Sequence, residues 1–256
     1  MDDKALPLTD HLSELRSRVA KIVLAWAIGT GVAWLYSEDL FRALLSPAIA
    51  ALGPSGGKLQ AISPTEIFFT YLKVALLAGF VATVPVFFWQ IWAFVSPGLY
   101  PAEKRVALPF VVVASTLFVA GAAFAHQLVF PTVFQFFASF RNDFVDPAWT
   151  MQEVFSMTTQ LILAFGVCFE MPVLVFFLAM SEIVTPAQLF GWTKYAVLVA
   201  FIVAAVLTPT PDAVTQTLLA GPLIALYLLG VAVAWLLVGK KKRAAASAEK
   251  SVATSP

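Results

Sequence analysis

The sequence has few charged residues, two histidines and a single cysteine. Of its 256 residues only 12% are charged, whereas soluble domains carry about 25%. In contrast, 60% are hydrophobic and the mean hydropathy is +0.87. A water-soluble fold of this size could not bury so much apolar surface, so we expect lipid to surround most of the chain. The lone Cys168 excludes a disulfide framework or a cysteine metal cluster, and the net charge of +1 argues against a nucleic-acid partner. No cofactor or metal site is predicted.

Six apolar stretches approach or exceed the roughly 20 residues that a helix needs to cross the hydrocarbon core. The sequence therefore predicts an all-α polytopic membrane protein with six transmembrane helices: 19–37, 67–93, 106–138, 155–180, 193–208 and 217–238. The third stretch would be about 50 Å long at 1.5 Å per residue. It must protrude or bend, and Pro131 is the predicted bending point.

Basic residues gather on one side of these six spans. With an even number of spans both termini share a side, and that side receives twelve of the sixteen Lys and Arg residues. The opposite side receives only Arg42, Lys58 and Arg141, and Lys73 lies inside the second span. This bias predicts that both termini are cytoplasmic. The chain then divides into three parts: a cytoplasmic amphipathic segment, 1–18, a six-span transmembrane domain, 19–238, and a basic, disordered cytoplasmic tail, 239–256.

Prolines recur in the apolar spans, at Pro85, Pro109, Pro131, Pro172 and Pro222. Each proline removes a backbone donor and tends to bend its helix, which predicts a bent, concave bundle. Ordinary proline enrichment in membrane helices is the alternative interpretation. The connection 38–66, which contains Pro47, is too apolar for a solvated linker and is predicted to cap the outer face.

Two segments on the predicted cytoplasmic side combine apolar residues with a carboxylate. The N-terminal segment has the pattern of an amphipathic helix, and Glu14 either forms a surface pair with Arg18 at i,i+4 or is presented to a ligand. The first cytoplasmic loop carries aromatic residues around Phe94, followed by Glu103. Such aromatics are interfacial anchors, or they form a surface for an extended peptide in which arginine precedes hydrophobic residues.

Glu170 lies inside the fourth apolar span, with no basic residue nearby in that helix. A charged residue at mid-membrane costs about 2.5 to 3.5 kcal/mol on insertion scales, so an intramembrane acid indicates function by default. We expect Glu170 to face a cavity or a partner. The structural alternative is that it bonds backbone groups freed by Pro172.

A polar turn follows the fifth span, from Thr208 through Asp212 to Gln216. It is either a simple proline-directed turn or, together with the short fifth span, a feature that thins the bilayer locally.

Four patterns occur in one order on this six-span frame: His11–Arg16, Phe94–Glu103, Phe169–Pro172 and Thr208–Gln216. Together they resemble the TatC family over roughly residues 8–240. Two positions depart from the family pattern. Thr210 interrupts what is often Thr-Pro-Pro-Asp, and His126 stands where an aromatic residue is expected.

The resemblance implies the core receptor subunit of a twin-arginine protein translocase, which is not an enzyme. It implies binding of twin-arginine signal peptides and cooperation with single-span TatA- and TatB-type subunits. Folded proteins would be moved across the membrane with the proton-motive force, and self-association in a receptor complex is expected. The location implied is a bacterial plasma or inner membrane, or an equivalent energy-transducing one.

The resemblance also implies roles for individual residues. The signal-peptide-binding residues would be Glu14, Arg16, Phe94 and Glu103. The intramembrane polar residues that meet partners would be Glu170, Thr208 and Gln216. Structural positions, including the outer face, would be Pro47, Pro85 and Asp212.

Two other functions were weighed against this one. A proton- or cation-coupled secondary transporter using Glu170 predicts repeated halves and more intramembrane ionisable groups, and neither is visible. An intramembrane hydrolase needs a second acid or a nucleophile–base pair, and the intramembrane His126 has no assignable partner in the sequence. The sequence therefore excludes the hydrolase.

Overall fold

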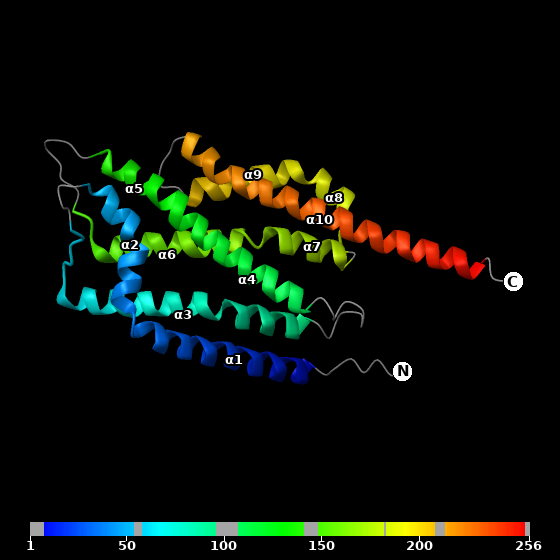
Figure 1. The fold of residues 1–256 in the computed structure, drawn as a ribbon, viewed down its shortest axis with the longest axis horizontal. Coiled ribbons are helices and arrows are strands. Elements are labelled where there is room, and N and C mark those ends of the chain that lie inside the picture. The colour runs from blue at the N-terminus through cyan, green and yellow to red at the C-terminus, as the bar shows by residue number, and fades with distance from the viewer. Residues whose placement is uncertain are drawn as a thin grey trace. The chain divides into compact units, whose positions relative to one another are not determined.

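The fold is almost wholly helical in this computed structural model, which describes residues 8–53, 58–95, 107–140, 148–181, 183–207 and 213–253 (Figure 1). The helices are α1 Leu8–Trp34, α2 Ser37–Ala51, α3 Pro64–Val95, α4 Ala107–Phe124, the π-helix η3 Ala125–Val129, α5 Phe130–Ala138, α6 Met151–Cys168, α7 Met171–Met180, α8 Pro186–Gly191, α9 Thr193–Leu207 and α10 Ala213–Ala253. The chain forms two compact units that meet in sequence between Leu163 and Ala164. The predicted tail, 239–256, overlaps the C-terminal part of α10.

Within the described residues, four helical stretches are long and apolar enough to cross a membrane: Pro64–Phe94, Leu108–Ala138, Met151–Met180 and Leu219–Leu236. A fifth candidate is the pair formed by α1 and α2, which meet at an angle of 87°. The fifth predicted span, 193–208, corresponds to α9, whose 15 residues are apolar but short. The prediction of an all-α polytopic membrane protein is therefore confirmed, with four to five candidate spans.

Helices α1 and α3 form the closest pair of the first unit and lie side by side (Figure 1). Trp26 packs against Phe80 and Trp34 against Phe68, so the two helices run antiparallel. Glycine allows their backbones to touch, because a Cβ built on Gly79 would lie 2.5 Å from the Thr30 backbone nitrogen. Small residues permit such close approach between membrane helices.

Helix α2 forms the region predicted to cap the outer face. Its residues Phe41, Leu45 and Ala48 are buried. Pro47, inside this helix, has no N–H to offer the carbonyl of Ala43 one turn earlier. The Ala43 oxygen accepts instead from the Ser46 hydroxyl over 2.8 Å, and the His126 Nε2 of η3 lies 3.0 Å from the same oxygen.

The third predicted span is distorted near Pro131, where the sequence predicts a bend. The distortion takes the form of the five-residue π-helix η3, which ends two residues before Pro131. Proline cannot donate to the carbonyl four residues earlier and its ring crowds that turn, so a widened turn relieves the conflict. Pro85 and Pro222 lie inside the uninterrupted helices α3 and α10.

The second unit has its own apolar core between α7, α8 and α10, which includes Val175, Leu189 and Val231. Helix α10 approaches α7 at Gly230, where a Cβ would lie 2.8 Å from the Pro172 Cα. The Tyr227 hydroxyl donates a hydrogen bond of 2.6 Å to the Leu189 carbonyl and fixes α8 against α10.

Candidate functional site

The predicted receptor carboxylate Glu14 forms an ion pair with Arg18 on the first turns of α1. The Arg18 Nε donates to Glu14 Oε1 over 3.1 Å, and an Arg18 Nη2 nitrogen makes a closer contact with the same oxygen. Oε2 of Glu14 has no bonding partner among the residues that the structure describes. The Glu14 side chain is 29% exposed and that of Arg18 is 19% exposed. Arg16 is exposed. The surface pair proposed as one alternative therefore forms, and it uses one carboxylate oxygen of the two.

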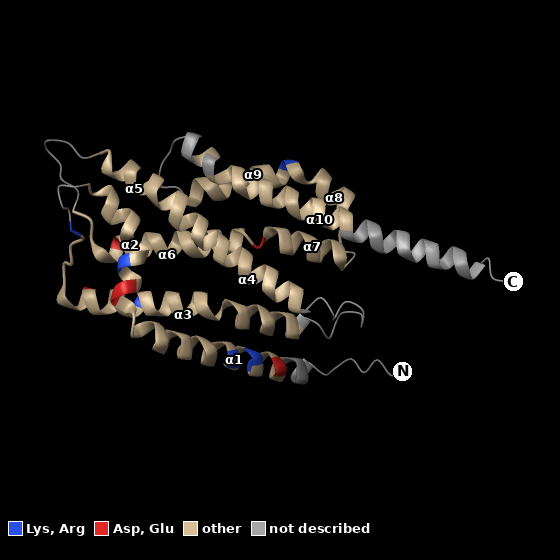
Figure 2. Cartoon of the chain, viewed as in Figure 1, with Lys and Arg blue, Asp and Glu red and all other residues tan. Residues whose placement is uncertain are grey.

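Antiparallel packing brings Glu14 and Phe94 to the same end of the α1–α3 pair. Glu14 precedes Trp26 by about 18 Å along α1, and Phe94 follows Phe80 by about 21 Å along α3, at 1.5 Å per residue. Figure 2 shows acidic and basic residues near the N-terminal end of α1, while the end of α3 beside it is uncharged.

Aromatic residues make the end of α3 a packed apolar surface. Trp92 is buried, with its ring 4.8 Å from that of Phe110 in α4, and Phe94 is half-buried. The fourth predicted receptor residue, Glu103, lies outside the described residues. The fold thus brings Glu14, Arg16 and Phe94 to one end of the first unit.

Glu170 occupies the short break between α6 and α7. It immediately precedes α7, and both of its carboxylate oxygens are buried. The break follows from Pro172, which cannot donate to the carbonyl of Cys168, the last residue of α6. The candidate span Met151–Met180 contains this break, so Glu170 lies within a stretch that is long and apolar enough to cross a membrane.

Of the polar turn after α9, the structure describes only the residues from 213 onward, which include Gln216. Gln216 donates from Nε2 to the Phe201 carbonyl over 3.0 Å, which ties the start of α10 to the middle of α9. Thr208 and Asp212 lie outside the described residues. Gln216 thus has a structural contact that sequence reasoning did not identify.

Glu66 is a buried carboxylate that the sequence analysis missed. Its Oε2 accepts the Ile62 N–H over 2.7 Å and its Oε1 accepts the Gln152 N–H over 3.0 Å, so one side chain caps both α3 and α6. Backbone bonds between Gln60 and the segment before α6 join the same region. The signal was available, because Ser63 followed three residues later by Glu66 at a helix start is a capping pattern.

Comparisons with known proteins agree with these observations. The family model described as "Sec-independent protein translocase protein (TatC)" matches residues 10–222. The chain belongs to the TatC family. A relative with that name in Desulforapulum autotrophicum is 41% identical over 241 residues, covering 94% of this chain and 88% of the relative. Another in Helicobacter pylori is 40% identical, covering 89% of this chain and 87% of the relative.

Solved structures of the family share the fold. A structure described as "Crystal Structure of Twin Arginine Translocase Receptor- TatC" is 34% identical, with a TM-score of 0.72 over 88% of this chain and 98% of that chain. A second, described with the same words and "in DDM", is 33% identical with a TM-score of 0.74. The chain is thus the receptor subunit of a Sec-independent protein translocase, a transporter and not an enzyme. This decides against a secondary transporter driven through Glu170.

Proposed function

We propose that the chain binds twin-arginine signal peptides at the end of the first unit where α1 begins and α3 ends. The observation that carries this proposal is the Glu14 carboxylate, whose Oε2 has no partner among the described residues and which lies at the same end as the aromatic residues around Phe94. A guanidinium has a planar fork of donors that matches a carboxylate, which lysine's ammonium lacks. Glu103, eight residues after the end of α3 in the sequence, would supply the second carboxylate, and Arg16 would lie beside the same patch.

The pair of Glu14 with Arg18 does not oppose this binding strongly. Surface ion pairs contribute about 0–1 kcal/mol, because water screens them and two long side chains lose freedom. A hydrogen bond to a charged group is worth about 1.5–3 kcal/mol. Two such bonds, one to each carboxylate, would change affinity by at least about a hundredfold, since about 1.4 kcal/mol is tenfold.

The test is a binding titration of arginine-pair and lysine-pair signal peptides on the purified chain. We expect Glu14→Ala and Glu103→Ala each to weaken binding of the arginine peptide about tenfold or more. Each should also erase most of the preference for arginine over lysine.

Glu38→Ala is the matched control, because Glu38 forms the same i,i+4 pair with Arg42 in α2. It should bind both peptides as the parent does. Parental binding of the arginine peptide by both Glu14→Ala and Glu103→Ala would place the receptor site elsewhere.

We further propose six spans in a concave bundle, with α9 as the short fifth span and both termini in the cytoplasm. The twelve-to-three distribution of basic residues supports this orientation. Residues 1–18 and 239–256 would then be cytoplasmic and 19–238 would form the membrane domain. Cysteines introduced at Ser55 and Ser251 in a Cys168→Ala background should react with an impermeant reagent from opposite sides. Labelling from the same side would contradict the six-span topology.

The proposed partners are single-span TatA- and TatB-type subunits, with self-association in the receptor complex and transport driven by the proton-motive force. Glu170, with buried carboxylate oxygens at a helix break, would face a partner helix or the inserted signal peptide. Thr208 and Gln216 would mark the partner-binding edge at the exit of α9, with Pro47, Pro85 and Asp212 in structural roles. The proposed location is a bacterial inner membrane or an equivalent energy-transducing membrane.

A further inference from the structure

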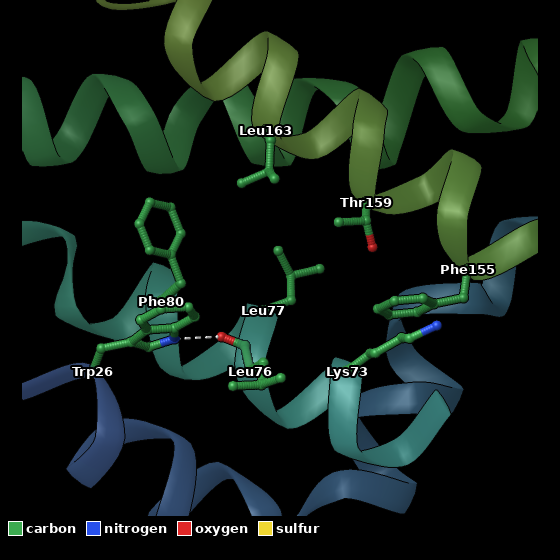
Figure 3. A pocket seen from close by; sticks show the side chains of 8 residues that line it. All are labelled: Trp26, Lys73, Leu76, Leu77, Phe80, Phe155, Thr159 and Leu163. Carbon is green, nitrogen blue, oxygen red and sulfur yellow. Dashed lines mark hydrogen bonds between the residues drawn. The ribbon is translucent and has the colours of Figure 1, made fainter. Parts of the chain in front are cut away.

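Lys73 of α3 lines two cavities of the first unit. One, of about 430 Å³, lies between α1, α3 and α6 and is apolar except for Lys73 and Thr159 (Figure 3). The other, of about 570 Å³, has several polar residues in its lining, among them Ser63, Glu66 and Glu153, and is called the polar cavity below. Both volumes lie within the roughly 300–1,000 Å³ typical of ligand sites. Lys73 is thus the residue whose side chain lines both cavities.

The charge of Lys73 is unusual for its place in the fold. The residue lies nine positions after the start of the span Pro64–Phe94, about 14 Å along the helix. Among the described residues no carboxylate lies within 4.0 Å of its Nζ. The nearby Glu66 uses its two oxygens for backbone N–H groups. A lysine at this depth extends its ammonium toward the headgroup region, where an anion can pair with it.

A second polar group in the apolar cavity has no partner. The Thr159 hydroxyl oxygen is buried, with no hydrogen-bond partner in the described part of the chain. Figure 3 shows Thr159 directing this oxygen toward the side of the cavity where Lys73 and Phe155 lie. Burying an unpaired hydroxyl is costly, so an occupant with an acceptor oxygen here would relieve the cost.

We propose that the two cavities hold one phospholipid whose headgroup carries both a phosphate and an ammonium group. The phosphate pairs with Lys73, and an acyl chain fills the cavity between α1, α3 and α6. An ester oxygen near the headgroup accepts from the Thr159 hydroxyl. The ammonium group meets Glu153, an exposed carboxylate at the start of α6 that lines the polar cavity.

Charge complementarity selects this occupant. An apolar partner helix would fill the apolar cavity but would bring no charges to pair with Lys73 and Glu153. A purely anionic headgroup would satisfy Lys73 but would bring a negative charge beside Glu153 and Glu66. A headgroup with charges of both signs fits each of these groups.

The experiment is native mass spectrometry of the purified full chain, titrated with phosphatidylethanolamine or phosphatidylglycerol of identical acyl chains. The parent should bind phosphatidylethanolamine more tightly. Lys73→Gln should weaken that binding about tenfold, whereas Lys73→Arg should retain it. Lys58→Gln is the matched control, because it removes the same charge from an exposed position that lines neither cavity.

Two further variants test the other contacts. Thr159→Val keeps the side-chain shape but removes the hydroxyl, so it should weaken the binding of both lipids severalfold. Glu153→Gln should abolish the preference for phosphatidylethanolamine over phosphatidylglycerol. Equal affinities of Lys73→Gln and Lys58→Gln for phosphatidylethanolamine would overturn the proposed site. A partner helix that occupies the cavities, together with lipid binding that does not depend on Lys73, would overturn it as well. Equal binding of both lipids by the parent would overturn the ammonium contact.

Discussion

Replacing Gly79 by alanine tests whether backbone contact between α1 and α3 sets the position of Glu14. The added Cβ would lie 2.5 Å from the Thr30 nitrogen and 2.7 Å from its Cα. Non-bonded heavy atoms prefer about 3.5–4.0 Å, so the two helices must separate by about 1 Å or more. The two closest obstructing atoms belong to the backbone, so a change of the Thr30 rotamer cannot relieve the conflict.

The expected loss of stability in Gly79→Ala follows from a comparison with Gly31→Ala. Both glycines belong to the same helix pair, but a Cβ at Gly31 meets nothing within 4 Å. The helix-propensity gain of alanine, about 1 kcal/mol, applies to both variants and cancels. The overpacking cost of about 1–3 kcal/mol applies to Gly79→Ala alone. At about 2–4 °C per kcal/mol, Gly79→Ala should unfold several degrees below Gly31→Ala.

The assay is thermal unfolding in detergent followed by circular dichroism, with signal-peptide binding as a second measurement. Because α1 carries Glu14, its displacement should also weaken binding of the arginine-pair peptide. Equal unfolding midpoints for Gly79→Ala and Gly31→Ala would refute the close approach of the two backbones.

Four further variants follow from single contacts. Glu66→Gln leaves only one carbonyl oxygen for two backbone N–H groups, so the unfolding midpoint in detergent should fall. His126→Phe leaves the Ser46 hydroxyl as the side-chain partner of the Ala43 carbonyl and removes the link between η3 and α2, so proteolysis of α2 should become faster; His126→Gln should largely restore the parental rate. Gly230→Ala drives a Cβ against the α7 backbone and should lower the unfolding free energy by about 1–3 kcal/mol in denaturant titrations. Glu170→Gln should insert and fold as the parent does but lose transport in a vesicle assay. A degraded Glu170→Gln protein would indicate a structural role instead.

Local patterns in the sequence were enough to predict the class of the fold. The apolar stretches of the sequence correspond to α1, α3, α4–α5, α6–α7, α9 and α10. They could be predicted because the hydropathy of about 20 consecutive residues decides whether a helix is stable in lipid. The motifs around Glu14 and Glu170 led to the family, because they consist of neighbouring residues in a fixed order.

The partners of polar groups needed the tertiary structure. His126 bonds a carbonyl 83 residues away, and Glu66 bonds an N–H 86 residues away. Sequence spacing predicts neighbours within a helix, such as the Glu14–Arg18 pair, but not which helices meet. Proline and helix starts leave backbone groups without a partner in their own helix. In a bilayer, the packing between helices decides which of these groups are paired with a donor or acceptor from elsewhere. The sequence determined which segments enter the membrane, and the packing of those segments decided what each buried polar side chain does there.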